Sequence, residues 1–109
     1  MDTISGLDQL IMLAALRHHP NAYGVSIKDE LLVRAGRDYS IGTIYSGLQR
    51  LERKGFLKSR MGEPEAKRGG RGKIFFSLTG EGRKTLQESL RSVEQLKVGL
   101  ILEPGASRA

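Results

Sequence analysis

The chain has 109 residues and no cysteine, so it has room for one hydrophobic core and excludes disulfides, thiolate metal sites and cysteine nucleophiles. Its formal charge of +6 comes entirely from residues 50–73, which contain nine basic and three acidic side chains. A local excess of positive charge of this size is typical of a nucleic-acid-binding surface. No apolar run is long enough to span a membrane, so we expect a soluble cytoplasmic protein with no membrane partner.

A first helix is predicted from about Ser5 to His18. Leucine, isoleucine and alanine cover most of its circumference, so we expect it to be largely buried. Pro20 and Asn21 then end it. The polar remainder of its surface consists of Asp8, Gln9 and Arg17. His18 and His19 diverge on a helix and have no further ligand nearby, so we expect no metal site.

A second helix is predicted from about Tyr23 to Ala35, closed by Gly36. Its outward side should carry Lys28, Asp29, Glu30 and Arg34. Its apolar side should consist of Val25, Ile27, Leu31, Leu32 and Ala35.

A third helix is predicted from Ser40, as its cap, to Gly55, in the left-handed conformation. One apolar stripe is formed by Ile41, Ile44, Leu48 and Leu51. With the second helix it makes a helix-turn-helix, whose second helix enters a DNA major groove. The other reading of this stretch is an ordinary amphipathic core helix. Candidate DNA contacts on its outward side are Ser40, Thr43, Tyr45, Ser46, Arg50 and Arg53.

Two strands are predicted next, at residues 56–61 and 73–78, where apolar and polar residues alternate or aromatic and β-branched residues gather. The segment between them is polar and rich in glycine, which indicates a hairpin with a long basic tip. We expect its cations to contact DNA phosphates, although a loop without a function would give the same composition. These cations are Lys67, Arg68, Arg71 and Lys73.

A last helix is predicted from Thr79, which can cap it. An aliphatic stripe recurs along it with a mean spacing of 3.5 residues, more than one small core can bury, so we expect a helix-to-helix homodimer. The alternative is that this helix folds back over the first helix. The stripe consists of Leu86, Leu90, Val93, Leu96 and Leu100.

These elements predict a mainly α fold with a small β-hairpin, an α+β arrangement of the winged helix-turn-helix type. Residues 1–78 should form the DNA-binding domain, residues 79–103 the dimerisation helix, and residues 104–109 a flexible tail.

Between about residue 7 and residue 90, a series of motifs occurs in the same order as in a known family. They are Tyr23-Gly24, the box Tyr39-Ser40-Ile41-Gly42-Thr43-Ile44-Tyr45 with Leu48, Leu51 and Glu52, Gly55, the wing Gly69-Gly70-Arg71-Gly72-Lys73, and Phe75-Phe76-Ser77-Leu78-Thr79 with Gly82. In this pattern the chain resembles the PadR-like transcriptional regulators, particularly short members with a single C-terminal helix. Ser46 and Gly72 stand where the family often has proline.

The resemblance implies a dimeric bacterial repressor that binds a palindromic operator in double-stranded DNA. It also implies that a small-molecule effector, not identified by the sequence, releases the DNA.

Other functions have less support in the residues. No catalytic triad, phosphate loop or carboxylate pair can be assembled, so we expect neither an enzyme nor a cofactor. The Arg-Gly run at residues 68–72 resembles an RNA-binding segment, and a winged helix can also bind a protein partner instead of an operator.

Overall fold

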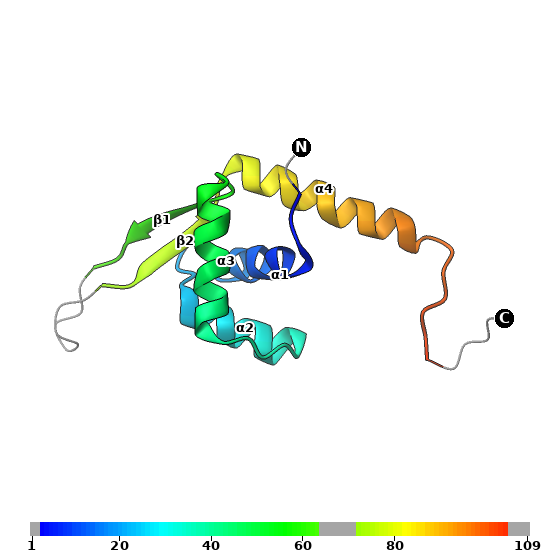
Figure 1. The fold of residues 1–109 in the computed structure, drawn as a ribbon, viewed down its shortest axis with the longest axis horizontal. Coiled ribbons are helices and arrows are strands. Elements are labelled where there is room, and N and C mark those ends of the chain that lie inside the picture. The colour runs from blue at the N-terminus through cyan, green and yellow to red at the C-terminus, as the bar shows by residue number, and fades with distance from the viewer. Residues whose placement is uncertain (1–2, 64–71, 105–109) are drawn as a thin grey trace.

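The computed structural model describes residues 3–63 and 72–104. Within these ranges it contains four helices and one antiparallel two-stranded hairpin (Figure 1), as the predicted winged helix-turn-helix fold requires. The elements are α1 (Gly6–Arg17), α2 (Gly24–Ala35), α3 (Ile41–Arg53), β1 (Leu57–Met61), β2 (Ile74–Leu78) and α4 (Gly80–Lys97).

Local signals in the sequence set the ends of the helices. The side chains of Ser5, Ser40 and Thr79 each accept a hydrogen bond from the backbone amide three residues later, which caps α1, α3 and α4. Gly36 ends α2 with φ at 66°, and Gly55 follows α3 with φ at 83°, a region that favours glycine. The predicted boundaries of these four helices are therefore confirmed to within a few residues, apart from the C-terminal end of α4.

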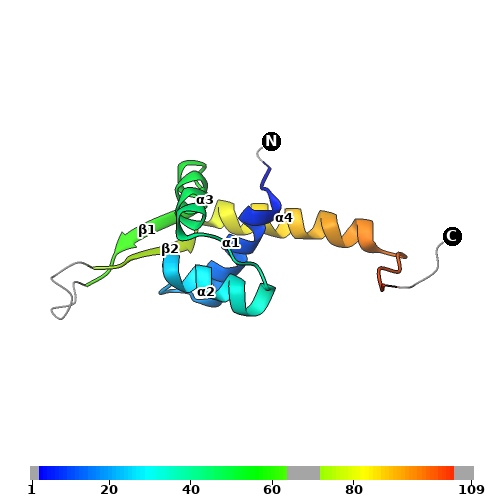
Figure 2. The ribbon, with the colours of Figure 1, turned by 60° about the horizontal axis from the view of Figure 1, so that its bottom comes forward.

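The core lies where α3 crosses α1 and where the base of the hairpin packs beside them (Figures 1 and 2). In the register of the hairpin, Leu57 pairs with Leu78 at the buried end and Met61 with Ile74 at the far end. No helix in the described ranges combines the length and apolarity needed to cross a bilayer. The largest fully buried apolar side chains are Ile11, Met12, Ile27, Ile44, Leu48 and Leu51.

Several positions predicted to be apolar contacts are exposed instead. On α2, only Gly24, Ile27 and Leu31 are buried, so the apolar side of this helix is narrower than the sequence predicts. Ile41 starts α3 beyond the edge of the core, and Met61 is 68% exposed because the hairpin extends past the core. The further positions on α2 that are exposed are Val25, Leu32 and Ala35.

The first half of α4 packs against the core, and its second half extends away from the core. Leu86 is buried and Leu90 packs against the core, whereas every residue from Arg91 onward in the described range is exposed. Its first half contacts α1, but its second half extends away from the other helices on the side opposite the hairpin (Figures 1 and 2). The helix therefore does not fold back over α1 along its whole length.

The prediction that this helix continues to residue 103 is wrong. α4 ends at Lys97, and Gly99 then adopts a left-handed conformation with φ at 82°. Leu100 consequently lies beyond the helix and is not part of its stripe. A glycine in this conformation commonly follows the last turn of a helix.

The start of α4 is fixed to the turn between α3 and β1. The Thr79 hydroxyl donates to the carbonyl of Gly55 at 2.6 Å and accepts from the amide of Gly82 at 2.9 Å. A Cβ placed on Gly82 would lie 2.0 Å from the carbonyl oxygen of Phe56, so the two backbones touch at this point. Only glycine permits this approach.

We expect Gly82→Ala to lower the free energy of unfolding by at least about 2 kcal/mol, because the added methyl group must push two backbone segments apart. Urea unfolding followed by circular dichroism measures this. Gly80→Ala is the matched control, since a Cβ at Gly80 meets nothing within 4 Å. Equal stability of the two variants would contradict the close approach.

Candidate nucleic-acid interface

The side of α3 that faces away from the core carries most of the predicted DNA contacts. Ser40, Thr43, Ser46 and Arg53 are all exposed there. The Ser40 hydroxyl is engaged in the helix cap, where it accepts from the Thr43 amide at 3.1 Å and donates to the Thr43 hydroxyl at 2.9 Å. The first two turns thus offer short polar side chains, which permit a close approach by a partner surface.

Tyr45 is held between α3 and the start of α2. It is 38% exposed, and its ring lies directly over Gly24, where a Cβ would come within 2.5 Å of the Tyr45 Cζ atom. The ring therefore packs on the first residue of α2 and fixes how the two helices of the helix-turn-helix meet.

Arg50 does not simply point outward. One of its guanidinium nitrogens donates to the carboxylate of Asp8, which is only 2% exposed. The sequence predicts Asp8 on the polar surface of α1, so its burial corrects that prediction. The ion pair satisfies a buried charge and ties α3 to α1, which gives Arg50 an internal partner that a DNA phosphate would have to compete with.

The surroundings of Asp8 favour its charged form. Burial of the carboxyl alone would raise its pKa, but hydrogen bonds from Arg50 and from the Ser5 backbone, together with the charge of Arg50, hold the pKa below its ordinary value. The spacing of Ser5 and Asp8 is that of a capping box, in which each side chain bonds the amide of the other residue. This spacing is the sequence signal that identifies Asp8 as a structural residue.

The predicted phosphate contacts of the wing are described only in part. Lys73 directly precedes β2, next to the far end of the paired strands, with its ammonium 4.4 Å from the centre of the Tyr23 ring. Tyr23, which the Lys73 ammonium contacts, directly precedes Gly24, on which the ring of Tyr45 packs. The start of α2 thereby connects the wing to α3. Lys67, Arg68 and Arg71 lie outside the described residues.

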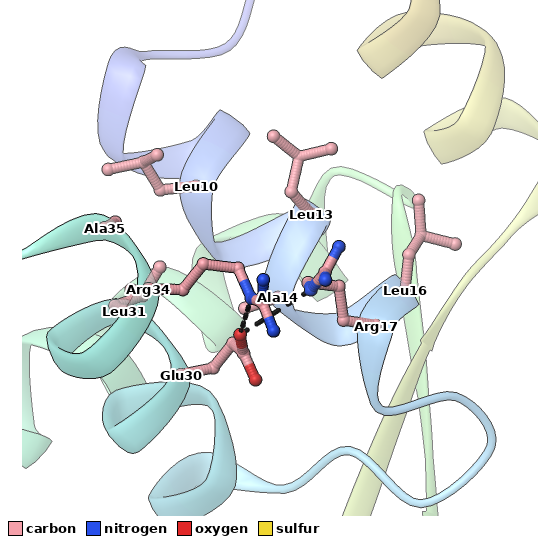
Figure 3. A pocket seen from close by; sticks show the side chains of 9 residues that line it. All are labelled: Leu10, Leu13, Ala14, Leu16, Arg17, Glu30, Leu31, Arg34 and Ala35. Carbon is pink, nitrogen blue, oxygen red and sulfur yellow. Dashed lines mark hydrogen bonds and ion pairs between the residues drawn. The ribbon is translucent and has the colours of Figure 1, made fainter.

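A second feature lies between α1 and α2, in a groove of about 440 Å³ (Figure 3). The sequence predicts that Glu30 faces outward, but its carboxylate is approached by Arg34 at 2.6 Å, by His18 at 2.8 Å and by Arg17 at 3.6 Å. Hydrogen bonds from Arg34 and then His18 lower the pKa of Glu30. The residues that line this groove are Leu10, Leu13, Ala14, Leu16, Arg17, Glu30, Leu31, Arg34 and Ala35.

The chain has no feature of a metal centre in its described part, where no three histidine, aspartate or glutamate side chains gather as ligands would. Its candidate site is therefore a surface formed by α3, the start of α2 and the wing.

Comparison with known proteins identifies proteins that are similar to this chain in sequence and fold. Residues 12–88 match the family model described as the transcriptional regulator PadR-like family. No curated protein matches the chain. The matched residues include α3, the whole wing and the first half of α4.

Solved structures with the same fold are also transcriptional regulators. A PadR-like transcription factor from Bacteroides fragilis is 31% identical, with 84% of this chain and 82% of that chain covered and a TM-score of 0.70. A transcriptional regulator from Clostridium thermocellum is 24% identical, with 84% and 85% covered and a TM-score of 0.69. Bacillus subtilis PadR in complex with operator DNA is 19% identical, with 96% and 55% covered and a TM-score of 0.66.

We expect Arg50→Met to lower the free energy of unfolding by about 2 to 3 kcal/mol at pH 7, because it leaves the buried Asp8 carboxylate without its cation. Arg50 lowers the folded-state pKa of Asp8, so its contribution is present above the unfolded pKa of about 3.9 and is lost as the pH falls through the folded values. The difference between the wild type and the variant should therefore be retained above about pH 4 and shrink as the pH falls below it.

Urea unfolding at a series of pH values measures this difference. Arg53→Met is the control, because Arg53 is exposed on the same helix and its removal should change stability by less than about 0.5 kcal/mol. A loss for Arg50→Met that does not depend on pH would mean that the ion pair with Asp8 is not its cause.

Proposed function

Because the chain belongs to the PadR-like family of transcriptional regulators, we propose that it binds a palindromic operator as a homodimer in the bacterial cytoplasm and represses transcription. The observation that carries the proposal is the exposed polar side of α3 beside a wing in the most basic quarter of the chain. A helix of this kind enters the major groove, while nearby cations bind phosphates.

In this proposal the side chains of α3 have separate roles. Thr43 and Ser46 are short, polar and exposed on its first two turns, where they can reach base edges. Arg53 lies in the last turn and is suited to a phosphate. Arg50 acts mainly through Asp8, by holding α3 on α1 at the angle required for entry into the groove.

The proposed dimer contact lies on the second half of α4. Val93 and Leu96 are 45% and 79% exposed, so a second copy can still cover them. Leu86 is already buried in its own core and has little surface to add. A symmetric contact of this kind places two α3 helices for half-sites about one helical turn apart, roughly 34 to 36 Å.

The groove between α1 and α2 is where we place the small-molecule effector. Its leucine and alanine walls suit an apolar ligand, and Arg17 and Arg34 outnumber Glu30 at its polar side, which favours a ligand with a negative charge (Figure 3). A ligand bound there would contact α1 and α2, the two helices against which α3 packs.

Selection of bound duplexes from a random pool tests operator binding, and we expect it to recover an inverted repeat. Thr43→Ala should then weaken binding to the recovered site by about 1 to 3 kcal/mol without a similar loss on unrelated duplex, because it removes a base contact and leaves the phosphate contacts in place. Binding of single-stranded RNA in preference to every duplex, or of no nucleic acid, would favour an RNA-binding or protein-binding module instead.

Val93→Glu combined with Leu96→Glu should yield a folded monomer with much weaker binding to the inverted repeat, because two charges are placed in the proposed contact. Analytical ultracentrifugation and DNA titration measure this. Gln87→Glu combined with Gln95→Glu is the matched control, since it changes the charge of the same exposed helix by the same amount. A dimer that survives the first pair of changes, or that is broken equally by the second, would place the interface elsewhere.

A further inference from the structure

The wing extends past the core and needs a support of its own. Met61 and Ile74, which pair at its far end, are 68% and 44% exposed. An isolated two-stranded hairpin is at best marginally stable in water. The direction of the wing must therefore be set by contacts between its strands and the rest of the protein.

Four side chains near the far end of the paired strands form a continuous row. The Arg60 guanidinium lies 4.6 Å from the centre of the Phe75 ring, directly across the hairpin. The Phe75 ring meets Tyr23 edge to face, with centroids 6.1 Å apart and planes at 85°. The Lys73 ammonium covers the Tyr23 ring at 4.4 Å. We name Arg60, Phe75, Tyr23 and Lys73 the wing ladder.

The ladder consists of two aromatic rings in contact, Phe75 and Tyr23, with one cation over each ring. A cation over a ring face and a pair of rings meeting edge to face are both favourable geometries for the ring quadrupole. Three of the four side chains come from the wing, and Tyr23 alone comes from outside it. Tyr23 is therefore the member of the row through which its rings contact the rest of the protein.

Hydrogen bonds attach the wing to the same segment before α2. One guanidinium nitrogen of Arg60 donates to the carbonyl of Pro20 at 3.1 Å and to the side-chain oxygen of Asn21 at 2.9 Å. The Phe76 amide donates to the Ala22 carbonyl at 2.8 Å, which adds a single bridge beside β2. These bonds hold both strands of the wing against the segment before α2.

The segment that leads into α2 contacts both the wing and α3. Tyr23 is followed by Gly24, on which the ring of Tyr45 rests. The ladder and the Tyr45 contact therefore lie on adjacent residues of one backbone.

We propose that the wing ladder sets the angle between the wing and α3, and that Tyr23 is a positioning residue for the phosphate contacts of the wing. This inference rests on the proposed binding of duplex DNA. Tyr23 acts through the ladder and does not touch the DNA in this arrangement, so its ring matters and its hydroxyl does not.

The first test measures the wing without DNA. In Tyr23→Leu, hydrogen exchange should become faster at the amide of Gly62, which donates to the Lys73 carbonyl at 2.7 Å, while amides in α3 keep their protection. Tyr23→Phe should restore slow exchange because it keeps the ring. Equal protection of the Gly62 amide in the wild type and in Tyr23→Leu would overturn the proposal.

The second test measures DNA binding in a double-mutant cycle. Tyr23→Leu should weaken binding and flatten its salt dependence by about 0.9 units of log slope for each phosphate that the wing no longer neutralises. Combined with Arg68→Ala and Arg71→Ala, it should cost little more, a departure from additivity well beyond the roughly twofold scatter of independent sites. Arg60→Met should behave like Tyr23→Leu and serves as the second variant if the latter unfolds.

The outcomes separate this proposal from the proposed function. If the wild-type protein binds no duplex DNA, both the proposed function and the proposed role of the ladder are wrong. A wild-type protein that binds duplex, with additive effects in the cycle, would overturn the ladder alone. An equal loss of affinity in Tyr23→Phe and Tyr23→Leu would also overturn it, because the hydroxyl would then be the contacting group.

Discussion

The packing of α3 against α1 is the constraint on which the rest of the structure depends. A Cβ on Gly47 would lie 2.5 Å from Cδ1 of Ile11, so the two helices approach as closely as a glycine allows. One turn further along, Arg50 reaches the buried carboxylate of Asp8. A close apolar contact and an ion pair thus fix both the distance and the rotation of α3. The side that it presents to solvent follows from these two contacts.

Much of the fold could be predicted from local signals, and the exceptions have physical reasons. Caps and left-handed glycines act within a few residues, so they marked the helix starts and the end of α2 correctly. Whether a side chain is buried depends on which elements pack against it. The apolar pattern of α2 does not indicate how few elements cover this helix. Leu100 was misplaced because a period of 3.5 continues in the sequence past Gly99, where the backbone leaves the helix. Asp8 was misjudged because a charged side chain can be buried when a distant cation meets it.

The candidate site could be predicted less completely than the fold. Periodicity alone placed Thr43, Ser46 and Arg53 on the exposed side of α3, because that side is determined by the helix itself. The partners of Tyr45 and Lys73 come from the start of α2, and no spacing in the sequence indicates these contacts. The register of the hairpin, which places Arg60 opposite Phe75, could be proposed only after both strand ends were known. Contacts between distant segments are what the sequence pattern leaves open.

The junction between β2 and α4 makes the hairpin and the last helix mechanically continuous. β2 ends at Leu78 and α4 starts at Gly80, with Thr79 as the single residue between them, bonded to the turn after α3. No flexible linker is available there to absorb a rotation of α4. In a dimer built on α4, a change in the crossing angle of the two helices would therefore act as a lever on both wings, and the spacing between the two wings would change with it.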